Sequence, residues 1–313
     1  MRKIFYVLVA TLLTVLLTAG CAQDRPYQVS EVSMDTVIQL IIYDKNAEQV
    51  ANKAIAEMRR LDAILNSYSA DSEISKINIQ AGHAVAVSEE TFAVVSRALV
   101  YAQKTDGAFD PTIGSVSKLW LIGKNGEFVP GDAQIKQALA LVDYRQVELN
   151  STERTVKLSK AGMVLDLGGV AKSYILETML QTLKDNGVKS ALINGGGDVL
   201  TLGKRADGKP WRIGVQDPRK PEGMIKVLDM DKYDQASTSG DYQRYFIKDG
   251  VRYHHIFDPR TGYPTRGLAS ATIVGKQAEV DLPSNVLMVM GEARATEFMH
   301  KYYPNVEFIL VRE

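Results

Sequence analysis

Apolar residues recur with two different periods in the first third of the chain. Residues 36–43 are rich in Val, Ile and Leu, which predicts a strand. Two later segments place apolar residues at helical spacing. The second begins behind Ser88, a good N-cap, with Glu89 and Glu90 in the first turn, where the helix dipole favours acidic groups. The apolar positions of the two predicted helices are Val50, Ala54, Met58, Leu61 and Leu65, then Phe92, Val95, Leu99 and Ala102.

The centre of the chain predicts a hairpin, a strand and a third helix. Residues 146–149 and 155–158 flank the turn-forming pair Asn150-Ser151, which predicts a hairpin. The apolar stretch 163–167 predicts another strand, which leads directly into Gly168-Gly169. The helix behind it is expected to end at Asn186-Gly187, and its spaced positions are Val170, Tyr174, Thr178 and Leu183.

The second half of the chain is dominated by short strands. They occupy residues 190–257 with glycine-containing turns between them, and helices are expected near 280–290 and 293–302. Because the strands cluster instead of alternating regularly with helices, the pattern favours an α+β fold with largely antiparallel sheets and packed amphipathic helices over a doubly wound nucleotide fold. Residues 31–313 contain no linker-like or low-complexity tract and are expected to form one unit.

The composition narrows the class of protein. The 313 residues are 45% hydrophobic and 24% charged, which is typical of an ordinary globular chain and excludes a disordered or collagen-like one. The 37 basic and 37 acidic residues cancel. This balance argues against a general nucleic-acid binder or a protein that coats anionic membranes, so we expect no nucleic-acid partner and look for local binding sites.

The N-terminus has the features of an export signal. Arg2 and Lys3 precede an uncharged run at 4–19, shorter than the roughly 20 residues that span a bilayer comfortably. Cys21, the only cysteine, follows small residues at the end of this run. The arrangement resembles a bacterial lipobox, which implies cleavage before Cys21 and a lipid on its sulfur. We therefore expect a signal peptide at 1–20, a lipidated tether at 21–30, and an exported protein anchored to a bacterial membrane and facing the periplasm.

Two glycine-containing segments are candidate ligand sites. Residues 166–172, from Asp166 to Lys172, place glycines and a lysine at a predicted strand-to-helix junction, where free backbone N–H groups can hold phosphate. The pattern lacks the glycines of a P-loop, and a plain turn explains it equally well. Residues 107–114 contain Phe109, Asp110 and Pro111, which are typical of a turn, or of a binding loop with an aromatic wall. The run at 195–197 favours a bend against neighbouring backbone.

Titratable residues near the C-terminus allow more than one interpretation. Adjacent His254 and His255 point to opposite faces of a strand, so a shared zinc site with Asp258 is disfavoured, and a histidine here either lines a pocket or supports the following turn. Asp281 stands near the start of the helix predicted at 280–290. It either caps that helix, which the local pattern favours, or binds Mg²⁺ as a hard oxygen ligand.

Six segments, taken together and in order, resemble the FAD:protein FMN transferase family, the ApbE-type flavin transferases. The resemblance extends from about Met34 to the C-terminus and implies a T-fold-like α+β domain that binds FAD and Mg²⁺. It further implies transfer of FMN to a Thr or Ser hydroxyl of an exported acceptor protein, with release of AMP. The segments are 34–36, 68–78, 107–114, 166–172, 236–241 and 255–264.

The resemblance also implies roles for individual residues. Met34, Tyr68, Ala108, Phe109 and Asp110 would line the flavin pocket, and Asp166, Lys172, His255 and Ile256 would also contact FAD. The metal would be held by the Gly169 carbonyl, Asp281 and Asn285. Asp281 is also a candidate catalytic base, as are His255 and a metal-bound water.

Two positions depart from the family pattern. Asn285 stands in place of a threonine metal ligand, and Asp35 in place of a glycine. The Asn285 carbonyl oxygen suits a hard cation, while Pro283 changes the start of the helix.

The resemblance suggests exported FMN-acceptor proteins as partners, such as redox subunits of respiratory ion-pumping complexes, and a lipid anchor in the membrane. Two alternatives stay open. One is an FAD pyrophosphatase that gives free FMN and AMP. The other is a flavin-binding lipoprotein whose catalysis is impaired by Asn285.

Overall fold

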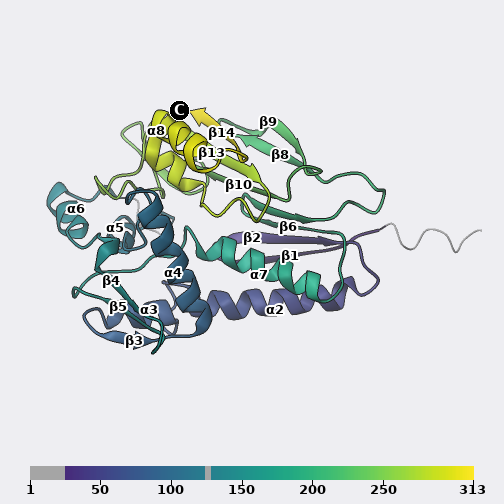
Figure 1. Cartoon of the computed structure of the whole chain (residues 1–313). Coiled ribbons are helices and arrows are strands. Elements are labelled where there is room, and N and C mark those ends of the chain that lie inside the picture. The colour runs from purple at the N-terminus through teal and green to yellow at the C-terminus, as the bar shows by residue number, and fades with distance from the viewer. Residues whose placement is uncertain (1–24, 124–127) are drawn as a thin grey trace, which may run out of the picture.

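A seven-stranded sheet forms the centre of the molecule (Figure 1). The computed structural model describes residues 25–123 and 128–313. The strand order is β1-β2-β6-β7-β10-β13-β14, and every neighbouring pair is antiparallel. This confirms the predicted α+β class with antiparallel sheets. The strands are β1 (Tyr27–Ser33), β2 (Thr36–Ile42), β6 (Ala191–Gly195), β7 (Asp198–Leu202), β10 (Gln235–Gly240), β13 (Leu268–Gly275) and β14 (Glu307–Arg312).

Two long helices, α2 (Ala47–Leu65) and α7 (Ala171–Asp185), lie side by side along one face of this sheet (Figure 1). Strand β2 alternates exposed residues with the buried Ile38, Leu40 and Ile42, as a strand with one covered face must. These side chains share a core with the buried stripe of α2, which includes Met58 and Leu61. The predicted strand and helix at this end of the chain are confirmed.

A smaller part of the molecule packs beside α2 and α7. It contains α3 (Glu73–Ile79), α4 (Glu89–Lys104) and a three-stranded sheet of order β3-β5-β4. Ser88 caps α4 as predicted, since its hydroxyl accepts a 3.2 Å hydrogen bond from the Thr91 N–H. The hairpin expected around Asn150 is also present. The other elements here are β3 (Ala84–Ala86), β4 (Val147–Asn150), β5 (Thr155–Leu158), α5 (Gly114–Trp120), α6 (Asp132–Leu139) and the 3₁₀ helix η1 (Tyr144–Gln146).

Two hairpins complete the fold. The first joins β8 (Arg212–Asp217) to β9 (Lys220–Asp229) and packs Val215 and Leu228 with main-sheet residues such as Val199 in a second apolar cluster. The second joins β11 (Tyr245–Lys248) to β12 (Val251–His254), and its Tyr253 ring stacks on Trp120 with ring centroids 5.5 Å apart.

The strand predicted at 163–167 is wrong. This segment is buried and extended, but it makes only one bridge, a parallel one between Ile113 and Val164. Its backbone is satisfied partly by the 111–114 backbone and partly by a side chain, because Asn78 accepts from the Leu165 N–H at 2.6 Å and donates to the Leu165 carbonyl at 3.0 Å. A side chain that imitates a neighbouring strand leaves no mark in the hydrophobic pattern of the segment itself.

Both ends of the folded chain also differ from the prediction. Strand β1 begins at Tyr27, so residues expected in the tether belong to the sheet. The helix expected from 280 begins instead at Asn285, and α8 (Asn285–Tyr302) is interrupted at Gly291, whose φ of 72° is not helical. The predicted division of this region into two helical parts is therefore right, whereas the predicted start is wrong.

Candidate functional site

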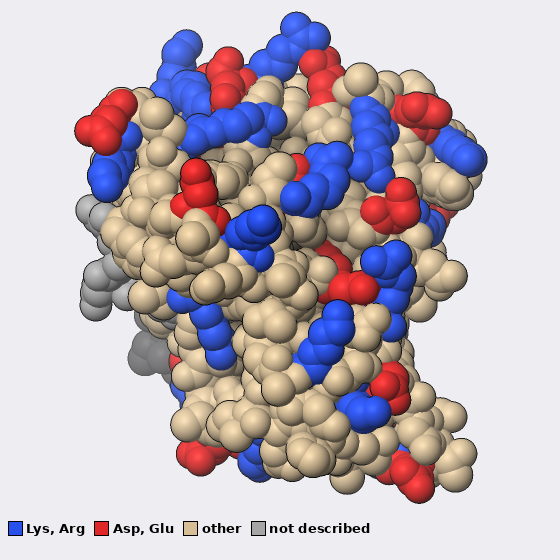
Figure 2. Space-filling view, turned by 90° about the vertical axis from the view of Figure 1, so that its left-hand side faces the viewer, with Lys and Arg blue, Asp and Glu red and all other residues tan. Residues whose placement is uncertain are grey.

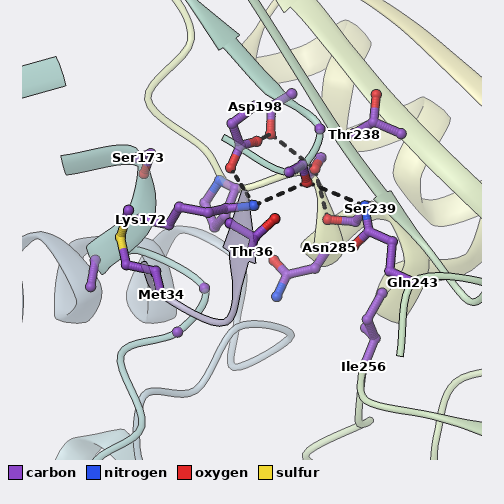
Figure 3. A pocket seen from close by; sticks show the side chains of 18 of the residues that line it. Met34, Thr36, Lys172, Ser173, Asp198, Thr238, Ser239, Gln243, Ile256 and Asn285 are labelled. Carbon is purple, nitrogen blue, oxygen red and sulfur yellow. Dashed lines mark hydrogen bonds and ion pairs between the residues drawn. The ribbon is translucent and has the colours of Figure 1, made fainter. Parts of the chain in front are cut away.

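A cavity of about 1010 Å³ lies where the start of α7, the β6–β7 turn, β10 and the start of α8 meet (Figure 3). Its volume is at the upper end of the roughly 300–1,000 Å³ that ligand pockets usually have. The structure brings together here every residue expected to contact FAD or metal, whereas Cys21 lies outside the described residues. The gathered residues are Met34, Tyr68, Ala108, Phe109, Asp110, Asp166, Gly169, Lys172, His255, Ile256, Asp281 and Asn285.

The turn between β1 and β2 supplies one part of the cavity wall. Met34 and Asp35 have φ angles of 53° and 57°, so both stand in the left-handed region that two-residue hairpin turns require. A glycine would adopt this conformation without strain, and aspartate is one of the few other residues often found in it. The Asp35 carboxylate lies 3.6 Å from the Arg244 guanidinium, which links the turn to the opposite rim.

The loop 107–114 is both a tight turn and a wall of the cavity. Phe109 is buried and packs edge-on against Tyr101, with ring centroids 6.0 Å apart. The Asp110 carboxylate accepts from the Thr112 N–H at 2.8 Å, the Thr112 hydroxyl at 2.6 Å and the Tyr144 N–H at 3.0 Å. Burial raises the pKa of Asp110, and these hydrogen bonds oppose that effect. Asp110 therefore holds the loop that presents Phe109.

The segment leading into α7 is held by internal hydrogen bonds. The Asp166 carboxylate accepts from the Ser117 hydroxyl at 2.6 Å and from the Gly168 N–H at 3.0 Å. Burial and the nearby Asp166 carboxylate raise the pKa of Tyr68 to about 12, so this phenol stays protonated at neutral pH. On α7 itself, the Lys172 ammonium lies 2.9 Å from the Asp198 carboxylate and donates to the Gly196 carbonyl at 3.3 Å.

The β6–β7 turn brings backbone close to its neighbours, as its sequence predicted. Gly196 has a φ of 60°, and a Cβ there would lie 2.3 Å from the Thr36 hydroxyl oxygen. Its carbonyl also accepts from Gln243 at 3.4 Å. The bend is therefore required by packing, and it also aims a carbonyl at the Lys172 ammonium.

Gly169 lies close to Phe109 and Asn285 in the cavity wall. A Cβ at Gly169 would lie 2.9 Å from the Phe109 ring and 3.1 Å from the Asn285 amide nitrogen. The Asn285 carbonyl oxygen is buried and has no hydrogen-bond partner among the described residues. A buried amide oxygen without a partner costs free energy, so it is an acceptor that a ligand or cation would satisfy.

Asp281 does not cap a helix. It precedes α8 by four residues and its side chain is 53% exposed, so the capping interpretation is wrong. Its carboxylate accepts from the Tyr303 hydroxyl at 2.5 Å and lies 3.4 Å from the Lys104 ammonium. Burial and the Asp281 charge together raise the pKa of Tyr303 well above its ordinary value.

The two adjacent histidines have different environments, as their opposite orientations predicted. His254 is buried and supports the chain, since its Nε2–H donates to the Thr265 carbonyl at 2.9 Å and its Nδ1 accepts from the Ile256 N–H at 3.3 Å. His255 is partly buried in the cavity wall, and its Nδ1 lies 3.2 Å from the Arg244 carbonyl. Because a carbonyl only accepts, Nδ1 carries the proton and Nε2 keeps a lone pair.

Sequence reasoning missed the residues that surround Lys172. Asp198 follows the glycine run at 195–197, Ser237 and Ser239 belong to the segment 236–241, and Ser284 precedes Asn285; none of the four was given a role of its own. The structure places all four on the cavity wall and connects them by hydrogen bonds. Serines two residues apart in a predicted strand share a face, and that signal could have found Ser237 and Ser239.

The fold and the site define an α+β protein with a large cavity whose wall carries the Phe109 ring and the Lys172 ammonium. A model of the ApbE family matches residues 34–310. An FAD:protein FMN transferase of Treponema pallidum is 32% identical and covers 97% of this chain and 90% of its own length. Another FAD:protein FMN transferase, of Klebsiella pneumoniae, is 36% identical over 86% of this chain and 84% of that protein.

Solved structures agree with this assignment. The crystal structure of the ApbE protein of Thermotoga maritima superposes with a TM-score of 0.85 and 33% identity, covering 92% of this chain and 94% of that one. The apo form of the flavinyl transferase ApbE of Pseudomonas stutzeri gives a TM-score of 0.81 at 27% identity, covering 94% and 93%. The chain belongs to the ApbE family and is an enzyme of flavin transfer.

Two further features of the described residues concern their helices and their surface charge. Within 25–123 and 128–313, no helix has the length and apolar character needed to cross a membrane. Figure 2 shows Lys and Arg interspersed with Asp and Glu over the visible face, with no broad area of a single sign.

Proposed function

We propose that the protein transfers FMN from FAD to a Thr or Ser hydroxyl of an exported acceptor protein and releases AMP. The acceptor oxygen forms a bond to the FMN phosphorus, and the bond from that phosphorus to the oxygen bridging to AMP breaks. The hydroxyl proton passes to a base, and the bridging oxygen leaves with AMP. The observation that carries this proposal is the convergence of Phe109, Gly169, Lys172 and Asn285 on one cavity in a chain of the ApbE family.

The cavity wall offers separate chemistry to the two kinds of group in FAD. The Phe109 ring and the Met34 side chain supply apolar surface that suits an isoalloxazine ring. The Lys172 ammonium, fixed by Asp198, supplies a positive charge for the diphosphate. The charge and the fixed position of Lys172 would lower the activation barrier for transfer, because phosphoryl transfer depends mainly on orienting the reacting groups and stabilising their charge.

The residues present fit a Mg²⁺ ion. The Asn285 carbonyl oxygen lacks a partner among the described residues, the neighbouring Gly169 has a backbone carbonyl, and Asp281 adds a carboxylate. All three are hard oxygen donors. When bound, Mg²⁺ would offset the diphosphate charge and polarise the phosphorus. Asn285 keeps the type of donor atom that the threonine of related sequences supplies, so we propose an active enzyme instead of an impaired flavin-binding protein.

Two side chains can accept the proton of the attacking hydroxyl. His255 keeps an unprotonated Nε2, and burial together with the Arg244 charge lowers its pKa well below the ordinary value. The Asp281 carboxylate is exposed but hydrogen-bonded to Tyr303. Comparing the pH–rate profiles of His255→Gln and Asp281→Asn separates them, because only the variant that lacks the base loses its dependence on that group.

We further propose that the enzyme acts outside the cytoplasm, held by a lipid on Cys21, on acceptors such as redox subunits of respiratory ion-pumping complexes. The support for this setting is the N-terminal lipobox-like sequence. Metabolic labelling with a radiolabelled fatty acid tests it, with Cys21→Ser as the control. Labelling of the Cys21→Ser variant equal to that of the wild type would contradict the anchor.

The transfer itself is tested with the purified full-length chain in detergent, FAD, Mg²⁺ and a threonine-containing acceptor domain. Intact mass and nucleotide analysis should show covalent FMN on the acceptor and an equal amount of AMP, and neither should appear with EDTA. An acceptor threonine→alanine variant is the matched control. Free FMN and AMP without labelled acceptor would indicate a pyrophosphatase, and bound but unchanged FAD would indicate an impaired enzyme; either outcome would contradict the proposal.

A further inference from the structure

Three serine hydroxyls form a continuous chain in the cavity wall. Ser237 and Ser239 are two residues apart on β10 and therefore project from the same face of the strand. Ser284, the residue before α8, lies between them. Its hydroxyl oxygen is 3.1 Å from that of Ser237 and 2.8 Å from that of Ser239. Ser237 also donates to the Asp198 carboxylate, which ends the chain.

Asp198 fixes the direction of every hydrogen bond in this chain. A carboxylate only accepts, and each serine has a single hydroxyl proton. Because Ser237 gives its proton to Asp198, its oxygen must accept the proton of Ser284. Ser284 has then spent its own proton, so its oxygen accepts from Ser239. The last member of the chain, Ser239, is left with only lone pairs for a ligand.

The Asp198 end is anchored by charge. Its carboxylate lies 2.9 Å from the Lys172 ammonium, and its side chain is only 14% exposed (Figure 3). An ion pair with little exposure is screened weakly by water, so the carboxylate is held as an acceptor. At the other end, Ser239 lines the cavity, and Figure 3 shows it on the wall from which Asn285 also projects.

We propose that Asp198 is a positioning residue that orders the serine chain, so that Ser239 presents a hydrogen-bond acceptor to a hydroxyl or amino group of the bound nucleotide. This role deepens the proposed function, since it takes FAD as the ligand. Its test measures binding and does not require transfer. A site that demands a donor also discriminates against analogues that lack one, because an unpaired buried acceptor is costly.

The substitution Asp198→Asn distinguishes chain polarity from simple loss of charge. The amide oxygen would face the Lys172 ammonium and the amide NH₂ would face Ser237. Ser237 would then accept and give its proton to Ser284, which would give its proton to Ser239. Ser239 would become a donor and would meet the donor group of the nucleotide unfavourably.

The experiment is a double-mutant cycle on FAD affinity, measured by flavin fluorescence with the full-length protein in detergent. Ser239→Ala should weaken binding about three- to tenfold, as expected for one hydrogen bond between uncharged groups. Asp198→Asn should weaken it more. Its cost should be at least about threefold smaller in the Ser239→Ala background, because contacting residues couple while separate ones add.

Ser270→Ala is the matched control. Ser270 is buried on the neighbouring strand β13, and its hydroxyl has no hydrogen-bond partner among the described residues. It does not line the cavity. FAD affinity should be unchanged. An equal loss in Ser270→Ala and Ser239→Ala would overturn the proposal, as would an equal cost of Asp198→Asn in both backgrounds.

Ser237→Ala gives a second test should Asp198→Asn fail to fold, as judged by circular dichroism. It cuts the chain and leaves the Lys172–Asp198 pair intact. The proposal requires weaker FAD binding in Ser237→Ala, with little added cost from Ser239→Ala; wild-type affinity would overturn it. Coupling without FMN transfer would refute the proposed function alone, and transfer without coupling would refute this inference alone.

Discussion

The cavity is bounded by two helix starts that are built in opposite ways. Ahead of α7, the Asp166 carboxylate is hydrogen-bonded to Ser117 and Gly168. On the helix, Lys172 forms an ion pair with Asp198. Ahead of α8, Asp281 is half exposed, and Asn285 buries a carbonyl oxygen without a partner among the described residues. The α7 side is therefore satisfied by the protein itself, whereas the α8 side keeps one buried acceptor, the Asn285 carbonyl oxygen, without a partner among the described residues.

This difference assigns separate tasks to the two sides. Groups fixed by internal hydrogen bonds are preorganised, so the α7 side can hold a ligand phosphate without paying to order its side chains. Oxygen atoms without partners are satisfied only when something binds, so the α8 side suits a cation. Gly169 lies close to both sides, because a Cβ at this position would contact both the Phe109 ring and the Asn285 amide.

The largest expected effect on the rate of FMN transfer comes from adding a side chain at Gly169. Gly169→Ala would place a Cβ 2.9 Å from Phe109, so the ring and the Asn285 amide must move. Because displacement of reacting groups by about 1 Å costs roughly a hundredfold, we expect FMN transfer to fall by about that factor. Gly131→Ala is the control, since the nearest atom there is 3.6 Å away and its φ is −70°. Similar rates for the two variants would show that the close approach of Gly169 to Phe109 and Asn285 does not matter for transfer.

Removing the charge of the α7 side should have the next largest effect. Lys172→Met should weaken FAD binding by about ten- to a hundredfold, the range for a hydrogen bond to a charged group. The change should not alter the Mg²⁺ concentration needed for half-maximal transfer. Lys157→Met, on the exposed β4–β5 hairpin, is the control. A raised Mg²⁺ requirement in Lys172→Met would show that the two sides do not have separate tasks.

Changing the α8 side should affect the metal instead. Asn285→Ala should raise the Mg²⁺ concentration for half-maximal transfer by about tenfold, because one oxygen ligand is lost. Asn285→Thr should stay within about threefold of the wild type, since a hydroxyl oxygen replaces the carbonyl. Titrations of the transfer rate with Mg²⁺ measure both. An Asn285→Ala enzyme with the wild-type requirement would remove Asn285 from the metal site.

A smaller effect is expected where Asp281 is held by its neighbours. Tyr303→Phe removes the hydrogen bond from the Tyr303 hydroxyl to the carboxylate, 2.5 Å long. Without this hydrogen bond, no tyrosine hydroxyl competes with Mg²⁺ for the Asp281 carboxylate. The Mg²⁺ concentration for half-maximal transfer should therefore be about two- to fivefold lower. A requirement that rises in Tyr303→Phe would mean that the tyrosine positions Asp281 for the metal.

The smallest expected effect is on stability against pH. Burial lowers the pKa of His254, and burial with the Arg244 charge lowers that of His255, below the ordinary 6.5. The unfolded chain therefore binds protons more readily than the folded chain below about pH 6.5. This contribution to stability is present above that pH and is lost as the pH falls. Thermal unfolding from pH 7.5 to 5.5 should show the loss, and His255→Gln should reduce it; an unchanged slope would contradict this origin.

Helices and strands that depend on interactions between residues close in sequence were predicted correctly from the hydrophobic pattern. The stripe of α2 and the Ser88 cap of α4 are both short-range features, and both are confirmed. The strand predicted at 163–167 failed because its partners are the 111–114 loop and the side chain of Asn78, both far away in sequence. The start of α8 failed because the apolar residues before Asn285 are buried without being helical.

The candidate site divides in the same way. Residues carried by recognisable motifs, such as Phe109 and Lys172, were predicted, and they do converge on one cavity. Asp198 and Ser284 were missed, because a hydrogen-bond chain across a strand, a turn and a helix start has no linear signature. The partnerless oxygen of Asn285 is likewise a property of packing, visible only once the neighbours are in place.

The most direct test of the two-sided cavity is a crystal structure of the enzyme with FAD and Mn²⁺, whose anomalous signal locates the ion. We expect FAD in the cavity with its diphosphate near Lys172, and the Mn²⁺ peak beside the Asn285 carbonyl oxygen and the Gly169 backbone. A peak elsewhere, or Asn285 turned away from the ion, would contradict the assignment of the metal to the α8 side.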